Sequence, residues 1–454
     1  MASSPSLIFV QLNEINFDVV REYVARFGDL PHFKHILAEF QAVSTHAEQQ
    51  YAQLEPWIQW VSMQTGKPFA EHGVFRLGDI VNAPASLVQI FELLESRGLR
   101  VGAISPMNAR NRLARPAYFV PDPWTDTPSD GTPFSRRVTA MLRQSVNDNA
   151  AGRLTLRSKL TIVEVLLRTF DWPHTRLFFR MLREAKSRPW TRALVLDQLI
   201  HLLHRALWLR TRPDASFVFL NAGAHLQHHY FFSAEPRDPQ RRNPAWYIGY
   251  DCDPIRDMLQ FYDRVLGDYL ALAGAPVRLV VATGLTQVPY DRVKYYYRLR
   301  DHAQFLQQAG ISFARVLPRM TRDFEIFFDT PGNMAVAQRK LSAMCIQRTG
   351  GAMFGDFEPR ESSLFLSLTY PGEIADSDVA VGEEGWHLPT LGRHVAFVAI
   401  KNGMHDTRGF AFFSPNCQLP HPLPQDIHVA RLFDLTCDQF AALRAAREPA
   451  SVIA

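Results

Sequence analysis

The chain contains little cysteine and no long apolar segment. Its 454 residues include four cysteines, Cys252, Cys345, Cys417 and Cys437, and none of them belongs to a Cys-x-x-Cys pair. This spacing argues against a disulfide framework or a cysteine metal site and favours reduced thiols. No stretch approaches the roughly 18 apolar residues of a membrane span, and the first residues lack the regions of a secretory signal. We therefore expect a cytoplasmic protein without a membrane-spanning helix.

The chain also lacks a large charge excess and the common nucleotide-binding motifs. A net charge of +4 is small for this length, so we expect no nucleic-acid partner. The sequence has no P-loop motif, no Gly-x-Gly-x-x-Gly after a predicted strand and no Gly-x-Ser-x-Gly, which argues against P-loop, dinucleotide-binding and serine-hydrolase classes. The composition, 47% hydrophobic and 21% charged, is that of a globular protein.

Short apolar runs alternate with stretches of helical periodicity. The predicted strands are residues 7–12, 100–105, 216–220, 277–281 and 397–401, and the predicted helices are 17–27, 86–97 and 257–272, with another helix starting at 56. Residues 402–405 are expected to form a turn after the last strand. This alternation predicts a doubly wound α/β fold with a mostly parallel sheet. Glu14, Asn221 and Thr283 follow predicted strands, at the sheet edge where ligands bind in such folds.

Composition divides the chain further. We expect a core of residues 1–130 and 214–415, a helical insertion at 131–213 and a C-terminal extension at 416–454 with a helix near 435–446. A loop-rich insertion at about 310–395 is expected to include part of the main sheet. Between Arg153 and Arg212 the sequence has 13 Lys/Arg and 4 Asp/Glu. Segments 176–183 and 201–210 there are predicted to be basic and amphipathic, facing an anionic substrate, a membrane surface or a partner, or else solvent.

One segment has an unusual spacing: Thr65-Gly66, five residues, then His72-Gly73. It resembles the segment that follows the nucleophile in the alkaline phosphatase superfamily, especially its type I phosphodiesterase/nucleotide pyrophosphatase branch. The resemblance implies an alkaline-phosphatase type of α/β fold, with an active site next to the turn that contains Glu55. His72 itself is expected to hold the loop through hydrogen bonds.

The resemblance also implies a site for divalent metals. Glu14 matches the acid after the first strand, His228 matches the histidine of an Asp-x-x-x-His run, and His405 matches a C-terminal histidine. His225 follows Ala224, which stands where the run has its acid. We therefore predict Glu14, His225, His228 and His405 as metal ligands, with zinc favoured and manganese or iron as alternatives. The competing interpretations are a helix N-terminal charge for Glu14 and a polar surface helix for the histidines.

Two departures from the superfamily pattern concern catalysis. Glu55 precedes Pro56 where the superfamily has a hydroxyl or thiol nucleophile, so we predict Glu55 as a general base, an extra ligand or a carboxylate nucleophile. After the strand 277–281, Thr283 and Gln287 occur where an Asp-His pair is expected, which implies that a second metal site is reduced or absent.

Trp57, Arg298 and Arg322 are candidate substrate contacts, because arginine suits phosphate and an aromatic ring can stack on a sugar or base. The sequence thus predicts a divergent metal-dependent hydrolase or transferase for a phosphoester or related anion, either a small molecule or glycan-linked. The alternative is a catalytically degenerate relative that binds a ligand or partner. Peripheral membrane contact through the basic helices is a further hypothesis.

Overall fold

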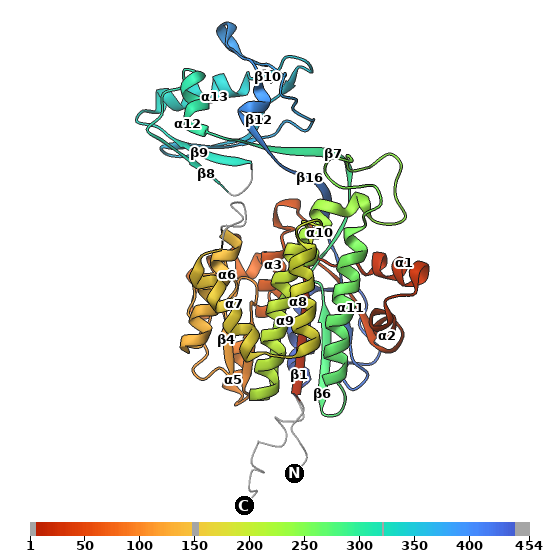
Figure 1. Cartoon of the computed structure of the whole chain (residues 1–454). Coiled ribbons are helices and arrows are strands. Elements are labelled where there is room, and N and C mark those ends of the chain that lie inside the picture. The colour runs from red at the N-terminus through yellow and green to blue at the C-terminus, as the bar shows by residue number, and fades with distance from the viewer. Residues whose placement is uncertain (1–5, 148–153, 320–321, 441–454) are drawn as a thin grey trace, which may run out of the picture. The chain divides into compact units, whose positions relative to one another are not determined.

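The structure is a computed structural model that describes residues 6–147, 154–319 and 322–440. The chain divides into two compact units (Figure 1). Unit 1 comprises residues 1–235, 253–288 and 404–454, and unit 2 comprises 236–252 and 289–403. The expected helical insertion at 131–213 lies within unit 1, and the expected loop-rich insertion at about 310–395 lies within unit 2.

Unit 1 is built on an eight-stranded sheet with the order β18-β2-β17-β6-β1-β5-β3-β4. Its strands are β1 (Ser6–Leu12), β2 (Gln41–His46), β3 (Val101–Ile104), β4 (Tyr118–Val120), β5 (Ala215–Leu220), β6 (Val277–Ala282), β17 (Arg408–Phe413) and β18 (Ile427–His428). β1 pairs in parallel with β5 and β6, while β17 runs antiparallel to its neighbours. Strands in the middle of a parallel sheet are covered on both faces and are therefore mostly apolar. β5 follows this rule, because all six of its residues are buried. The predicted α/β fold with a mostly parallel sheet is confirmed.

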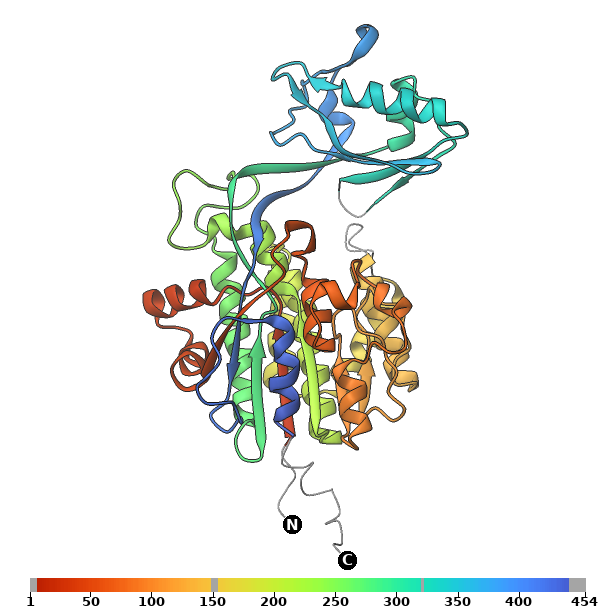
Figure 2. The same ribbon diagram turned by 180° about the vertical axis from the view of Figure 1, so that it is seen from behind.

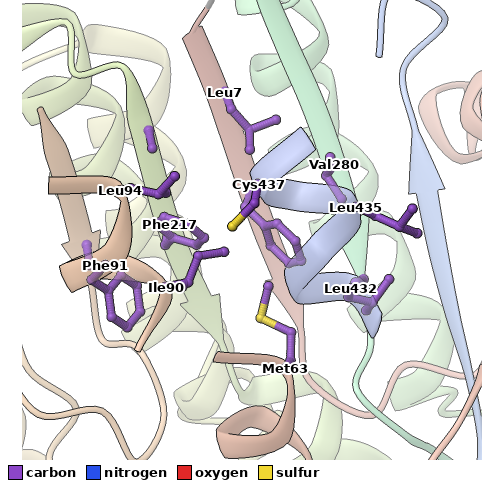
Figure 3. Close-up of a cluster of buried hydrophobic side chains, with 14 of the residues drawn as sticks. Leu7, Met63, Ile90, Phe91, Leu94, Phe217, Val280, Leu432, Leu435 and Cys437 are labelled. Atoms are coloured by element: carbon purple, nitrogen blue, oxygen red, sulfur yellow. The ribbon is translucent and has the colours of Figure 1, made fainter. Parts of the chain in front are cut away.

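Helices cover both faces of this sheet (Figures 1 and 2). One face packs on α9 (Thr191–Thr211) and α11 (Pro254–Leu272), and the other packs on α3 (Pro56–Thr65), α5 (Ile90–Ser96) and α14 (Leu432–Asp438). Figure 3 shows the second layer: Leu7, Phe217 and Val280 of the sheet meet Phe91 of α5 and Leu435 of α14. Helix α5 begins later than predicted, and α14 begins earlier and ends at Asp438. Residues 441–446 of the predicted helix lie outside the described residues.

The sequence determines α1 (Phe17–Phe27) through its two caps. The Asn16 side chain accepts hydrogen bonds from the backbone N–H groups of Asp18 and Val19, and Gly28 ends the helix with φ 68°. A side-chain acceptor at the start and a left-handed glycine at the end are the usual helix boundaries. The predicted range 17–27 is confirmed, and a second helix, α2 (Pro31–Glu39), follows it.

The helical insertion contains α6 (Pro133–Asn147), α7 (Leu156–Arg168), α8 (Trp172–Glu184) and α9. α6 packs on α7, and both α7 and α8 pack on α9, which lies against β5. Twelve residues of α9 are buried, among them His201 and His204. The prediction that 201–210 is an amphipathic surface segment is wrong for 201–204, which are buried between the sheet and the outer helices, whereas 205–207 and 209 are half-buried and Arg210 is exposed. In the described part of the chain, no helix is both long and apolar enough to span a bilayer.

Unit 2 has its own sheets and its own core. Its elements are β8 (Arg315–Pro318), β9 (Asp323–Phe327), β10 (Cys345–Ile346), β11 (Gly351–Ala352), β12 (Phe354–Pro359), β13 (Ser363–Leu368), β14 (Ala380–Val381), β15 (His387–Leu388), α12 (His302–Gln308) and α13 (Pro331–Ser342). The strands form two four-stranded sheets, β12-β13-β9-β8 and β11-β10-β14-β15. The prediction that this region adds strands to the main sheet is wrong.

The chain enters unit 2 along β7 (Thr286–Leu299) and returns along β16 (Val395–Asp406), which pair as a two-stranded sheet. The strand predicted at 397–401 is the middle of β16. The turn predicted at 402–405 is wrong, because pairing with β7 continues the strand through His405 to Asp406.

Candidate metal centre

Glu14 follows β1 at the carboxyl end of the parallel strands. Its side chain is only 2% exposed and its backbone has a left-handed φ of 62°, which is uncommon outside glycine and marks a strained or functional position. The Glu14 N–H donates to the Thr283 carbonyl at 3.1 Å, just past β6. This bond holds the turn against the neighbouring strand and keeps the carboxylate in the interior.

Two histidines from distant parts of the chain meet this carboxylate. His228 lies on α10 (Ala222–Tyr230), which follows β5, and its Nε2 is 3.4 Å from Glu14 Oε2. His405, near the end of β16, places its Nε2 3.2 Å from the same oxygen. The two imidazole rings are 5.0 Å apart between centroids. One potential ligand atom from each of the three residues lies within 4.8 Å of the others, and we call these residues the Glu14 group.

The backbone orients the His405 ring. Its Nδ1 lies 2.8 Å from the Leu54 carbonyl oxygen, which accepts the Nδ1–H and so fixes the tautomer with a lone pair on Nε2. That Nε2 is buried and lies 3.2 Å from Glu14 Oε2. A histidine that donates one N–H to a carbonyl and offers the other nitrogen to the site is the usual arrangement of a metal ligand.

Electrostatics couple the members of the Glu14 group. Burial raises the pKa of the Glu14 carboxyl, but His405 and His228 lower it more, so its pKa lies well below the ordinary range. Burial lowers the pKa of His405, while the carboxylates of Glu14 and Glu55 raise it above its ordinary value. The centre therefore favours a negative charge on Glu14 and a positive charge facing it.

Amides surround Glu14 and complete its hydrogen bonds. Asn13 Nδ2 donates to Glu14 Oε1 at 2.9 Å, Gln287 Nε2 donates to Glu14 Oε2, and Gln227 Nε2 donates to the Glu14 carbonyl at 2.7 Å. Trp60 in turn donates its indole N–H to Asn13. Sequence reasoning did not assign Asn13 or Gln227 to the site. The available signal was position, because Asn13 directly follows β1 and Gln227 lies between the histidines of α10.

Glu55 lies beside the group, at the N-terminal end of α3. Its Oε2 is 3.7 Å from His405 Nδ1, and its side chain is 32% exposed. The carboxylate does not cap the helix, and it reaches both solvent and the edge of the centre. The position predicted for a general base is thus next to the Glu14 group, while its catalytic role stays a prediction.

The Thr65–Gly73 segment has a structural explanation. Gly66 ends α3 with φ 68°, and a Cβ there would come within 2.9 Å of the Phe433 ring. His72 ends the short helix α4 (Phe69–His72), where its Nε2 contacts Ser62 Oγ at 3.1 Å and its Nδ1 accepts the Val74 N–H at 3.0 Å. Burial lowers the pKa of His72 to about 4, which keeps it neutral in this loop-holding role.

His225 is not part of the Glu14 group. Its ring lies 4.4 Å from the His229 ring, between centroids, on the exposed side of α10. Positions 224 and 228 lie about 40° apart around the helix, whereas 225 lies about 60° from 228, on the side away from 224. Ala224 occupies the site-facing position and offers only its carbonyl, which accepts a bond from Gln287.

The three predicted substrate contacts lie in two units. Trp57 is in the first turn of α3 in unit 1 and donates its indole N–H to the Phe75 carbonyl at 3.0 Å. Arg298 and Arg322 belong to unit 2, where Arg322 pairs with Asp356 at 3.3 Å and lies over the Tyr296 ring. Their role in substrate binding stays a prediction.

The residues present fit a single divalent cation. One carboxylate oxygen and two imidazole nitrogens form a donor set that suits zinc and also manganese or iron. The buried His405 Nε2 faces Glu14 Oε2 at 3.2 Å, so in its neutral form this nitrogen could join the carboxylate in holding a cation. Gln287 lies in the segment where an Asp-His pair was expected to bind a second cation, and its amide donates to Glu14.

Comparisons with known proteins give only a distant likeness. No protein-family model matches the sequence, and no curated protein sequence matches it significantly. Phosphonoacetate hydrolase from Sinorhizobium meliloti 1021, solved with phosphonoformate, aligns over 96% of both chains with 12% identity and a TM-score of 0.42. Murine ectonucleotide pyrophosphatase/phosphodiesterase 5 aligns over 96% of this chain and 95% of its own, with 11% identity and a TM-score of 0.41. Likeness of this degree establishes neither a family nor an activity.

Proposed function

We propose that the protein is a metal-dependent hydrolase or transferase that acts on a phosphoester or a related anionic ester, with a small or glycan-linked substrate. The observation that carries the proposal is the convergence of Glu14, His228 and His405 within 4.8 Å at the carboxyl edge of the sheet. The Thr65-Gly66…His72-Gly73 pattern, which resembles the alkaline phosphatase superfamily, supports the choice of phosphoesters.

In this proposal Glu14, His228 and His405 hold one divalent cation, with zinc favoured. The cation would supply Lewis acidity, neutralising charge that develops on the oxygens of the ester. Glu14 stays ionised because its pKa is depressed, and the Leu54 carbonyl keeps the His405 lone pair directed into the site.

Glu55 is the proposed general base. It is the one carboxylate at the start of α3 that is partly exposed and beside His405, so it can accept a proton from a water or a substrate hydroxyl. A carboxylate in this place cannot act as the alkoxide nucleophile of the superfamily. We therefore propose direct attack by water or an acceptor hydroxyl, with Glu55 removing its proton.

The test combines metal analysis with turnover. Purified protein should contain about one equivalent of a transition metal, and His405→Ala should lose it, because one of three ligands is gone. Glu55→Gln should retain the metal but lose about 100-fold or more in kcat on the best ester of a panel, as expected for removal of a general base. Glu71→Gln, at an exposed site on α4, is the matched control and should keep full activity. Metal-free protein with unchanged properties would contradict the proposal.

The alternative is a catalytically degenerate protein that binds a ligand or a partner. It is favoured by the carboxylate at Glu55 in place of a nucleophile and by Gln287 in place of an acid at the second site. It predicts a bound metal with no turnover on any phosphate or sulfate ester. An equal lack of activity in wild type and Glu55→Gln would support this alternative over the hydrolase.

A further inference from the structure

Helices α7 and α8 expose an unusual amount of apolar surface. They are joined by a turn of three residues, 169–171, and both pack on α9. Eight large apolar side chains of these helices and their turn are 42–73% exposed: Leu156, Leu160, Val163, Leu167, Phe170, Trp172, Phe179 and Leu182. We call these eight residues the α7–α8 apolar face. A single exposed leucine is ordinary, but a cluster of this kind marks an interaction site.

On α7 the apolar side chains form one narrow stripe. Leu156, Leu160, Val163 and Leu167 are spaced by four, three and four residues, which places them on a single helical face. The opposite face, with Thr161 and Val165, is buried. The helix therefore has two apolar sides: an inner side that packs in the protein and an outer stripe that is exposed to solvent.

The turn and α8 continue this surface with aromatic side chains. Phe170 lies in the turn, Trp172 begins α8, and Phe179 follows two helical turns later, while Phe178 and Met181 face the interior. Tryptophan and phenylalanine on the outer face of a basic helix are typical of segments that lie in the interfacial region of a bilayer.

Unpaired cations flank the apolar face. Arg157, Lys159, Arg176 and Arg183 are exposed and form no ion pair with any residue in the described ranges. The acids of the two helices and their turn are already neutralised. Glu164 pairs with Arg137 and Arg168, Asp171 pairs with Arg205, and Glu184 pairs with Arg180.

A pocket beside α8 adds to this positive charge. Its volume is about 640 Å³, and it is lined by Arg176, Arg180 and Arg264 together with His174 and Asp268. Burial and the neighbouring Arg180 lower the pKa of Arg264, since two guanidinium groups face each other there. Asp268 is engaged by His201 at 2.7 Å and Arg180 by Glu184 at 3.8 Å, whereas Arg176 forms no ion pair with a described residue and can attract an external anion.

These charges distinguish between the possible occupants of the apolar face. A second copy of this chain in a two-fold dimer would bring the same surface against itself, with arginine facing arginine. An anionic bilayer surface instead offers negative headgroups to the flanking cations and acyl chains to the leucines and aromatic rings. Each of the two helices has 13 residues, too few to span a membrane, so contact would be peripheral.

We propose that the α7–α8 apolar face docks the protein on an anionic lipid bilayer. Leu160, Leu167, Trp172 and Phe179 would enter the interfacial region, while Arg157, Lys159, Arg176 and Arg183 contact lipid phosphates. The docking is independent of the Glu14 group, and it would bring the enzyme to substrates carried at a membrane surface.

Vesicle flotation of the full-length protein tests the proposal. Wild type should bind vesicles of phosphatidylcholine mixed with phosphatidylglycerol, should bind phosphatidylcholine alone far more weakly, and should be released by high salt. The triple variant R157Q/R176Q/R183Q should bind about 100-fold more weakly, at about 1 kcal/mol per cation and tenfold per 1.4 kcal/mol. The control R292Q/R300Q/R393Q removes three exposed arginines from unit 2 and should bind as wild type.

A second pair of variants tests the apolar contacts. W172A/F179A should reduce binding to the anionic vesicles about tenfold or more, because large aromatic areas no longer enter the interface. W246A/Y250A removes two exposed aromatic side chains of unit 2 and should have no effect. All four positions are exposed, so unfolding temperatures should stay close to wild type.

Equal binding to anionic and neutral vesicles, or equal binding by variants and controls, would overturn the proposal. A concentration-dependent dimer that W172A/F179A dissociates, in a protein that ignores vesicles, would assign the face to a second copy. Binding of wild type to an acidic protein but not to anionic vesicles would likewise exclude the lipid surface.

Discussion

Helices α8 and α9 follow one another in the chain and each contains three arginines, yet their environments are opposite. α9 is enclosed between the sheet and the outer helices, and even its Asp197, His201 and His204 are buried. α8 keeps Phe179 and Leu182 in solvent. A basic amphipathic pattern therefore does not identify a surface helix, because tertiary packing decides which polar groups find partners inside.

Two buried polar side chains of α9, Asp197 and His204, have specific partners. Asp197 accepts from the Ala222 N–H at 2.9 Å and from the Tyr262 hydroxyl at 2.7 Å. His204 contacts Tyr269 Oη at 2.9 Å and Ser216 Oγ at 2.6 Å. α8, in contrast, has exposed cations without acidic partners among the described residues. α9 therefore contributes to the fold, while the exposed cations of α8 are available for the docking proposed above.

The largest expected difference between the helices is in core packing. Leu203→Ala on α9, where the side chain is 2% exposed, should lower the free energy of unfolding by about 3 kcal/mol through loss of buried area and cavity formation. Leu160→Ala on α7 should change it by less than about 0.5 kcal/mol. Urea unfolding followed by circular dichroism measures both free energies. Similar losses of stability in the two variants would contradict the difference between buried and exposed helices.

Asp197 gives the next largest effect. Asp197→Ala should cost about 2 kcal/mol, because buried donors at Ala222, Asn221 and Tyr262 lose their acceptor. Since two of these donors begin α10, the variant should also weaken metal binding at His228. Glu184→Ala on α8 removes only an exposed ion pair and should cost less than about 1 kcal/mol. Chemical denaturation and metal titration together check this prediction.

His204 predicts a pH dependence of stability. Burial lowers its pKa to about 3, from an ordinary value of 6.5, so between these values the unfolded chain binds a proton that the folded protein does not. Acidification therefore favours unfolding, by at most about 1.4 kcal/mol per pH unit. Between pH 6.5 and pH 4.5, wild type should lose about 2 kcal/mol more than His204→Asn. The same loss in both proteins would contradict the neutral, buried state of His204.

The smallest effect is expected on α8. Trp172→Ala should change the free energy of unfolding by no more than about 0.5 kcal/mol, because its ring is 66% exposed and folding buries little of it. Differential scanning calorimetry in the absence of lipid measures this change. A large drop in unfolding temperature would mean that Trp172 stabilises the fold and is not free for docking.

Local signals predicted much of the central fold. β1, β5 and β6 are continuous apolar runs and were predicted to within one residue at each end, and α1 was predicted from the same kind of pattern. Helix α5 was predicted to begin at Ser86, but it begins at Ile90. Gln89 and Glu92 form a capping box at the start of α5. The Gln89 side chain also accepts a hydrogen bond from the Arg110 N–H and donates one to the Gln64 side chain. Such contacts between distant segments cannot be seen in a local pattern.

The candidate site was predictable only in part. Strand ends and the superfamily resemblance indicated Glu14, His228 and His405, which the fold brings together. His225 was included because residues three apart can share a helical face, but the orientation of α10 depends on Asp197 and Gln287, which lie far away in sequence. The Leu54 carbonyl that orients His405 carries no side-chain signal, so no sequence pattern indicated it.

The hydrogen bond between His405 and Leu54 joins residues 351 positions apart, and this has a consequence for biosynthesis. A ribosome delivers Glu14, Leu54 and Glu55 long before His405, and β17, which borders β6 in the sheet, emerges later still. Because contacts so distant in sequence form late and slowly, the growing chain would hold an incomplete centre until His405 has been synthesised. Chemistry at this site would begin only after His405 has left the ribosome and β16 has formed.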